Sequence, residues 1–202
     1  DDDIYVLDYF NGSWQQPQKL TFNATPDTMP AISASGDRIA YIGGPEGERG
    51  IHFIEYRDGV WQAPEKISGS QYDDYFPSMN ADGTRIVFQS KDAQGNRFIR
   101  LLEQHDGIWD EPMTLPDTTS NNMFPVISAD GTKVAFYAEQ GGYRHIYFTE
   151  YKNVTWSDPL RLTEGDEQNI QPSISAGGSS IVYYWTGEQF LSHVQPGATA
   201  EI

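Results

Sequence analysis

The chain has 202 residues and a formal net charge of −16, from 13 lysines and arginines against 29 aspartates and glutamates. A protein that binds phosphate backbones needs a basic face, so this balance argues against nucleic acid and against an anionic membrane as the partner. The absence of cysteine excludes disulfides, zinc–thiolate sites and a thiol nucleophile.

The sequence contains no apolar run close to the roughly 18 residues of a membrane span, so we expect no membrane insertion. It begins with DDDIY rather than with methionine. We interpret it as a mature chain or an excised part of a longer one, without its targeting segment. Cationic partners, metal ions and neutral ligands remain open.

The first expected elements are a short strand at residues 4–7 and a strand around Trp14, joined by an Asn-Gly turn. An alternating strand after Pro30, a glycine turn and a β-branched strand follow. A polar loop then leads to another strand at residues 51–54, and the same order of elements begins again.

Two sets of aligned residues mark this internal repeat. The prolines that open it are Pro30, Pro77, Pro125 and Pro172. Tryptophans with the same spacings, 47, 48 and 47 residues, are Trp14, Trp61, Trp109 and Trp156. Four short antiparallel strands in about 47 residues are typical of one blade of a β-propeller.

We therefore predict an all-β fold, a β-propeller of four four-stranded antiparallel blades that is complete or part of a larger ring. Residues 1–202 form a single domain, with repeats at about 4–50, 51–98, 99–145 and 146–202. The chain begins with strands three and four of a blade and ends with strands one and two, so the termini are expected to share one blade. Residues 190–194 resemble a further third strand, which indicates either a displaced latch or a longer propeller.

The aligned tryptophans are expected to pack between blades or on their outer strands. The core is expected to contain one apolar residue from each first strand. Those residues are Ile32, Met79, Ile127 and Ile174.

The pattern Phe-Pro-Ser-x-x-x-Asp-Gly-x-x-Ile-x-Phe from Phe76, followed by Ile-Tyr and by Gly-x-Trp-x-x-Pro-x-x-Leu, resembles the TolB-type propeller repeat. The resemblance covers nearly the whole chain. It implies an exported bacterial protein, periplasmic or secreted, that acts as a binding platform or as the non-catalytic propeller of a larger enzyme. The extra amino-terminal α/β domain of TolB itself is not in this sequence, so we expect a relative with the same repeat rather than TolB.

Three functions are compatible with this pattern. The first is a non-catalytic binding or scaffold module that recognises a protein, peptide or glycan through the channel mouth and loops. The second is an accessory propeller of an exported peptidase or glycan-processing hydrolase. The third is a structural repeat protein that assembles, as a homo-oligomer, into a larger ring. The sequence has no Gly-x-Ser-x-Gly, phosphate-loop or His-Glu-x-x-His motif, so we predict no catalytic residue and no certain cofactor.

One candidate site is a set of short polar residues, each three positions before an aligned proline. Its members are Asp27, Asp74, Asn122 and Asn169. Such side chains often hydrogen-bond nearby backbone and shape the entry to a strand. Alternatively, carboxylate and amide oxygens around a channel mouth are suitable ligands for Ca²⁺.

Two further candidates concern ligand binding. Trp185 stands where the other repeats have the small residues Gly43, Ser90 and Ala138, so it is either a stacking platform or a cover over the irregular last segment. Arginines also recur at the ends of the variable loops before the third strands, where they either pair with acidic neighbours or form an anion-binding arc. They are Arg49, Arg97 and Arg144.

Overall fold

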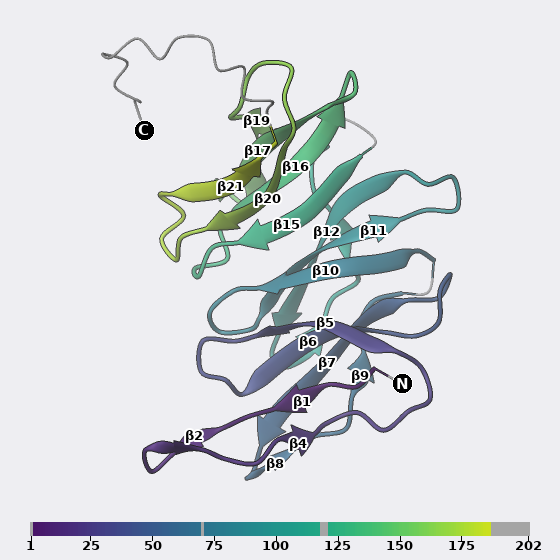
Figure 1. The fold of residues 1–202 in the computed structure, drawn as a ribbon, viewed down its shortest axis with the longest axis vertical. Coiled ribbons are helices and arrows are strands. Elements are labelled where there is room, and N and C mark those ends of the chain that lie inside the picture. The colour runs from purple at the N-terminus through teal and green to yellow at the C-terminus, as the bar shows by residue number, and fades with distance from the viewer. Residues whose placement is uncertain (1, 70, 118–120, 187–202) are drawn as a thin grey trace.

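The computed structural model of the chain describes residues 2–69, 71–117 and 121–186. Every element within those residues is a β-strand, and the antiparallel sheets follow one another along an arc (Figure 1). The predicted all-β fold of antiparallel blades is thereby confirmed, and the number of blades in the complete ring stays a prediction. None of the described residues forms a helix long and apolar enough to cross a membrane.

Three whole blades form the middle of the arc, and in each the fourth strand is split into two short pieces. The first blade consists of β5 (Asp27–Ile32), β6 (Arg38–Gly43), β7 (Gly50–Arg57), β8 (Val60–Trp61) and β9 (Glu65–Lys66). The second consists of β10 (Asp73–Met79), β11 (Arg85–Lys91), β12 (Arg97–His105), β13 (Ile108–Trp109) and β14 (Met113–Thr114). The third consists of β15 (Asn122–Ile127), β16 (Lys133–Gln140), β17 (Tyr143–Lys152), β18 (Thr155–Trp156) and β19 (Leu160–Arg161).

A half-blade lies at each end of the arc. Among the described residues, the N-terminal half-blade contains third and fourth strands, namely β1 (Tyr5–Val6), β2 (Tyr9–Phe10), β3 (Ser13–Trp14) and β4 (Gln18–Lys19). In the described part of the C-terminal half-blade there are a first and a second strand, β20 (Asn169–Ile174) and β21 (Ile181–Trp185). Within the described residues no strand of one half-blade pairs with a strand of the other, and Figure 1 shows them at opposite ends of the arc.

The second strands of the whole blades explain how the blades hold together. β6, β11 and β16 are buried along almost their whole length, because a neighbouring blade covers each face. Their β-branched and aromatic residues suit a strand that packs on both sides. The equivalent strand β21 is largely exposed, since no blade follows it in the described part of the chain.

The aligned tryptophans pack toward the preceding blade. The ring of Trp109 lies 5.0 Å from that of Phe53 in the first blade, and Trp156 is buried beside Leu101 of the second. Trp14 is exposed, and its ring lies 5.4 Å from that of Tyr9 in its own hairpin, so it packs on an outer strand rather than between blades. The physical reason is that no blade precedes the N-terminal half-blade in the described structure.

The residues predicted for the core are also buried only where a neighbouring blade covers them. Ile127 is buried and Met79 packs against a core cluster, whereas Ile32 is exposed, contrary to the prediction. Ile32 faces the side of the first blade where the N-terminal half-blade has no first and second strands to cover it.

Candidate functional site: the concave groove

The first strands β5, β10, β15 and β20 carry the same irregularity. In each, the register with the second strand shifts at the Xaa-Pro dipeptide, as between Tyr75 and Ser78 in β10. Such a β-bulge leaves residues unpaired and redirects their side chains. The residue before each proline is in the left-handed region, with φ between 51° and 54°: Met29, Phe76, Phe124 and Gln171.

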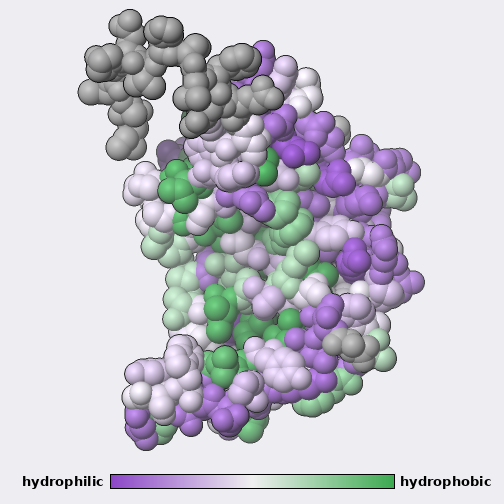
Figure 2. Space-filling model, viewed as in Figure 1, coloured by the Kyte–Doolittle hydropathy of each residue, from purple (hydrophilic) through white to green (hydrophobic). Residues whose placement is uncertain are grey.

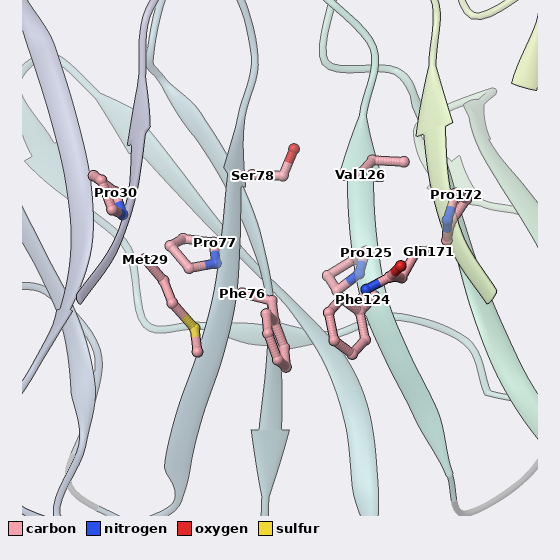
Figure 3. Close-up of a pocket in the computed structure, with 10 residues that line it drawn as sticks. All are labelled: Met29, Pro30, Phe76, Pro77, Ser78, Phe124, Pro125, Val126, Gln171 and Pro172. Carbon is pink, nitrogen blue, oxygen red and sulfur yellow. The ribbon is translucent and has the colours of Figure 1, made fainter. Parts of the chain in front are cut away.

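These residues and their prolines line a groove of about 360 Å³ at the inner edge of the blades (Figure 3). Figure 3 shows the side chains of Met29, Phe76 and Phe124 pointing the same way, side by side across the strands. The rings of Phe76 and Phe124 stack with centroids 3.7 Å apart and planes 26° apart. Phe124 stacks in turn on Tyr137, at 5.5 Å. The groove therefore has an aromatic wall, built by residues from successive blades.

The lining contains no ionisable side chain, although the chain carries a net charge of −16. Its polar side chains are Ser78 and Gln171. The Ser78 hydroxyl already accepts a hydrogen bond from the Ile127 N–H at 3.2 Å, across the boundary between two blades. On the face shown in Figure 2, hydrophobic and neutral residues cover the middle, while hydrophilic residues gather at the loop ends on the right.

The Asp and Asn positions predicted as a calcium site lie at the start of the first strands, and all four are buried. Asp74 accepts hydrogen bonds from the hydroxyls of Ser68, at 2.5 Å, and Ser90, at 2.6 Å. Burial raises the pKa of Asp74 to about 6, although both hydroxyl hydrogen bonds act in the opposite direction. Asn169 donates to the carbonyl oxygen of Arg144, at 3.2 Å.

Asp27 differs from Asp74 because its cross-strand partner is Gly43, where Asp74 faces Ser90. One carboxylate oxygen of Asp27 accepts from the Asn23 amide at 2.8 Å. The other, Oδ1, is buried and has no hydrogen-bond partner among the described residues. The side chain of His52 lies close by, since a methyl group added at Gly43 would meet both Asp27 and His52.

All four aligned polar residues thus make hydrogen bonds to neighbouring protein groups, and that of Asn122 is donated to the carboxylate of Asp117. The described residues contain no group of three or more His, Asp or Glu side chains placed to hold a metal ion. Calcium binding at these positions stays a prediction.

Trp185 ends β21 and is the cross-strand partner of Asn169, the position that Gly43 and Ser90 occupy in earlier blades. Its indole N–H donates to the carboxylate of Glu167 at 2.5 Å, and its ring is partly exposed. Trp185 thus lies on β21 opposite Asn169 and is not among the residues that line the groove.

The three arginines lie at equivalent blade boundaries, and their backbones join one blade to the next. The carbonyl of Arg49 accepts from Asp74 N–H at 3.3 Å, and the N–H of Arg144 donates to the Glu167 carbonyl at 3.2 Å. Arg97 makes an isolated bridge to Asn121.

The arginine side chains have different surroundings. Arg49 donates to the hydroxyl of Tyr75, at 2.9 Å, and its guanidinium lies over the same ring. Arg144 lies over Tyr137 and is 3.8 Å from the Glu139 carboxylate. Ligand binding by these arginines stays a prediction.

The residues directly before the aligned prolines line the groove, but they are not among the site residues predicted from the sequence. The signal was present, because the position directly before Pro30, Pro77 and Pro125 holds a large apolar side chain.

No family model and no curated protein matches this sequence. Solved structures do match it. TolB from Acinetobacter baumannii has a TM-score of 0.60 at 23% identity, over 84% of this chain and 40% of that one. A putative TolB from Agrobacterium tumefaciens has a TM-score of 0.66 at 19% identity, over 88% and 61%. An oligogalacturonate lyase from Vibrio parahaemolyticus has a TM-score of 0.66 at 16% identity, over 93% and 54%.

The chain therefore spans less than two thirds of the length of each of these structures. At such identities the likeness concerns the fold, and it agrees with the repeat read from the sequence. In its fold, the chain is a β-propeller of the TolB type.

Proposed function

We propose that the chain is a non-catalytic binding module that holds an apolar segment of a peptide in the concave groove. The observation that carries this proposal is the stacked pair of Phe76 and Phe124, which lies in an open groove rather than in a closed core. A peptide side chain that packs on this wall gains apolar burial and aromatic contact.

The backbone supports the same conclusion. A left-handed conformation costs a non-glycine residue roughly 1–2 kcal/mol, and both phenylalanines adopt it. Strained residues of this kind concentrate at functional sites, where the surrounding structure holds them in place. Here the strain aims two large rings into the groove.

The chemistry of the lining favours a peptide over a glycan. A glycan presents many hydroxyl groups, and the lining has few polar side chains to bind them. The net charge of −16 favours a neutral or basic peptide over an acidic one.

The proposal is tested with peptides selected from a random library against the whole chain. The double variant Phe76→Ala, Phe124→Ala should bind a selected peptide at least about tenfold more weakly, since each aromatic contact contributes roughly 0.5–1.5 kcal/mol. Ile108→Ala is the matched control, because Ile108 is exposed on an outer hairpin far along the blade from the groove. Equal affinity of the double variant and the wild type, with both folded, would contradict the proposal.

A second candidate is the accessory propeller of a larger exported enzyme that processes peptides or glycans. The structural similarity to a lyase, of which this chain spans 54%, supports this second candidate function. Turnover of peptides or glycans by the chain, in place of binding without turnover, would support it. Under either proposal we place the protein outside the cytoplasm, periplasmic or secreted, as its TolB-like repeat suggests.

A further inference from the structure

The aromatic wall of the concave groove continues beyond the residues that line the groove. The ring of Tyr75, next to Phe76 in β10, lies 6.1 Å from the ring of Phe76. At the other end of the wall, Phe124 stacks on Tyr137 of β16. Four rings from two neighbouring blades therefore form one continuous row, and the stacked pair of Phe76 and Phe124 is its centre.

An arginine covers each end of this row. The guanidinium of Arg49 lies 5.3 Å from the centre of the Tyr75 ring, and that of Arg144 lies 6.0 Å from the centre of the Tyr137 ring. Both distances are within the range of a cation–π contact. Two of the three arginines that recur before the third strands thus belong to the surroundings of the groove.

At the Tyr75 end the charged groups already bind one another. The carboxylate of Asp73 accepts hydrogen bonds from the backbone N–H groups of Gly47 and Arg49, each at 3.1 Å. The Arg49 side chain donates to the Tyr75 hydroxyl, which in turn donates to Asp73 at 3.3 Å. A ligand at this end would have to compete with these hydrogen bonds.

At the Tyr137 end the cation is held less firmly. The Nε atom of Arg144 lies 3.8 Å from Oε2 of Glu139, which is an ion pair but is too long for a hydrogen bond. The Arg144 side chain is 40% exposed and that of Glu139 is 39% exposed. An ion pair as exposed as this one contributes little to stability, so an anionic ligand can replace Glu139 at low cost.

A second arginine adds positive charge at the same end. Burial raises the pKa of the Tyr137 phenol, and the charges of Arg144 and Arg97 act in the opposite direction. Arg97 therefore lies close enough to Tyr137 for its charge to act there. The chain has a net charge of −16, and the groove lining has no ionisable side chain, so this end is where an anionic group of a ligand is most favoured.

The groove also becomes polar toward this end. Figure 3 shows Met29, Phe76, Phe124 and Gln171 in succession across the first strands. The polar side chain of Gln171 belongs to β20, and Arg144 is joined to the start of the same strand, because its carbonyl accepts from the Asn169 amide. The apolar side chain of Met29 lies at the opposite end of the succession. The two ends of the groove therefore suit different parts of a ligand.

We propose that the groove binds a peptide by its free carboxyl terminus. The terminal carboxylate pairs with Arg144, the last apolar side chain packs on Phe76 and Phe124, and the preceding residues run toward Met29. Guanidinium and carboxylate are planar groups whose donors and acceptors match in pairs. This inference rests on the proposed function, and it names the class of peptide that the groove takes.

A chain terminus fits the charge of the protein better than an acidic side chain does. A peptide rich in aspartate and glutamate is repelled by the net charge of −16. A neutral or basic peptide still carries one carboxylate, at its end, and it brings the least negative charge to Arg144. The contacts from Phe124 to Tyr137, at 5.5 Å, and from Tyr137 to Arg144, at 6.0 Å, are short. A residue packed on Phe124 can therefore reach the guanidinium with its own carboxylate.

The probe is a heptapeptide selected against the whole chain from a random library with free carboxyl termini. It is then synthesised as the acid and as the carboxyl-terminal amide. The acid should bind at least about tenfold more tightly than the amide, since the amide lacks the charge that strengthens hydrogen bonds to arginine. Equal affinities would overturn the proposal. An amide with aspartate as its last residue that binds as tightly as the acid would overturn it in favour of an acidic side chain.

Arg144→Gln tests the residue assigned to the carboxylate. This variant should lose the preference for the acid and keep the wild-type affinity for the amide. Arg57→Gln is the matched control, because it makes the same change of charge at a side chain that is 63% exposed at the outer end of β7. The control should keep the preference. Loss of the preference in both variants, or in neither, would contradict the proposal.

Glu139→Gln gives an expected gain, which partial unfolding does not produce. The Glu139 carboxylate competes with the peptide terminus for Arg144, so its removal should strengthen binding of the acid severalfold. Binding of the amide should not change. Weaker or unchanged binding of the acid by this variant would overturn the pairing with Arg144.

The double variant Phe76→Ala, Phe124→Ala separates this inference from the proposed function. If it weakens binding of acid and amide alike, and the wild type does not distinguish the two, the groove binds peptides but not by their termini. If it binds both as tightly as the wild type does, the proposed function fails, even where Arg144→Gln removes the preference for the acid. A library that yields no binding heptapeptide would overturn both.

Discussion

The buried carboxylate of Asp74 lowers the stability of the fold at neutral pH, and Asp74→Asn should remove that cost. Asp74 has no exposed surface, and burial raises its pKa from 3.8 to about 6. The folded state therefore binds the proton more tightly than the unfolded state does. The contribution of this group to stability is fully present below about pH 4 and is lost as the pH rises toward and through 6.

The magnitude follows from the difference between the two pKa values. A pKa of about 6 against 3.8 corresponds to roughly 3 kcal/mol between acidic and neutral pH. Asparagine keeps one oxygen to accept from Ser68 or Ser90 and presents its amide to the other hydroxyl oxygen. This exchange changes stability by about 1 kcal/mol at every pH. Asparagine already occupies the same repeat position at Asn122 and Asn169.

Urea unfolding of the wild type and the variant at pH 4, 5, 6 and 7 measures the effect. The stability of Asp74→Asn relative to the wild type should rise by roughly 2.5 kcal/mol across this range, most of the full difference. Asp130→Asn is the control of opposite sign, because hydrogen bonds from Ser128 and Thr132 lower the pKa of Asp130 to about 2. Its carboxylate stabilises the fold above pH 4, and that contribution is lost as the pH falls through 2.

A variant that loses the same stability at every pH would refute the reasoning. So would a loss that grows as the pH rises. Either result would mean that the two serine hydroxyls and the charges of Arg100 and Lys66 stabilise the ionised carboxylate at least as much as burial penalises it.

Two other predictions concern the repeat. Trp156→Ala should reduce the free energy of unfolding by about 3–5 kcal/mol because this ring is buried. Trp14→Ala should change the free energy of unfolding by less than about 1 kcal/mol because this ring is exposed. Similar losses for the two variants in urea unfolding would contradict the blade assignment. After removal of bound metal with a chelator, calcium at about 100 times its dissociation constant should stabilise the chain by roughly 2.7 kcal/mol. This should raise the melting temperature by a few degrees. Asp27→Ala should abolish that shift, and an unchanged wild-type melt would exclude the site.

The fold was predictable because the repeat supplies four copies of the same information. Aligned prolines, tryptophans and hairpin glycines fix strand order within a blade, and they do so independently of one another. The exposure of Ile32 and Trp14 was not predictable from the repeat. Burial of those side chains depends on which blade lies beside them, and equivalent sequence positions at the ends of an array have different neighbours.

The site was predicted less well, for a related reason. The repeated polar residues Asp27 and Asp74 predicted a site, but both are buried at the start of first strands. The groove is lined instead by the apolar residues Phe76 and Phe124. The difference between the two aspartates depends on the strand opposite, where Gly43 leaves one oxygen unpaired and Ser90 satisfies it. Only the strand register brings those residues together.

The bulge before each aligned proline has a consequence for how recognition can change. Methionine, phenylalanine and glutamine occupy this position with nearly the same φ. The direction of the side chain is thus set by the backbone and not by the residue that happens to be there. Substitutions at Met29, Phe76, Phe124 and Gln171 can alter what the groove accepts while the blades stay as they are. The side chains at these four positions can therefore be exchanged while the backbone of the blades stays the same. A combinatorial library confined to these positions would change the peptide specificity of the groove without a redesign of the scaffold.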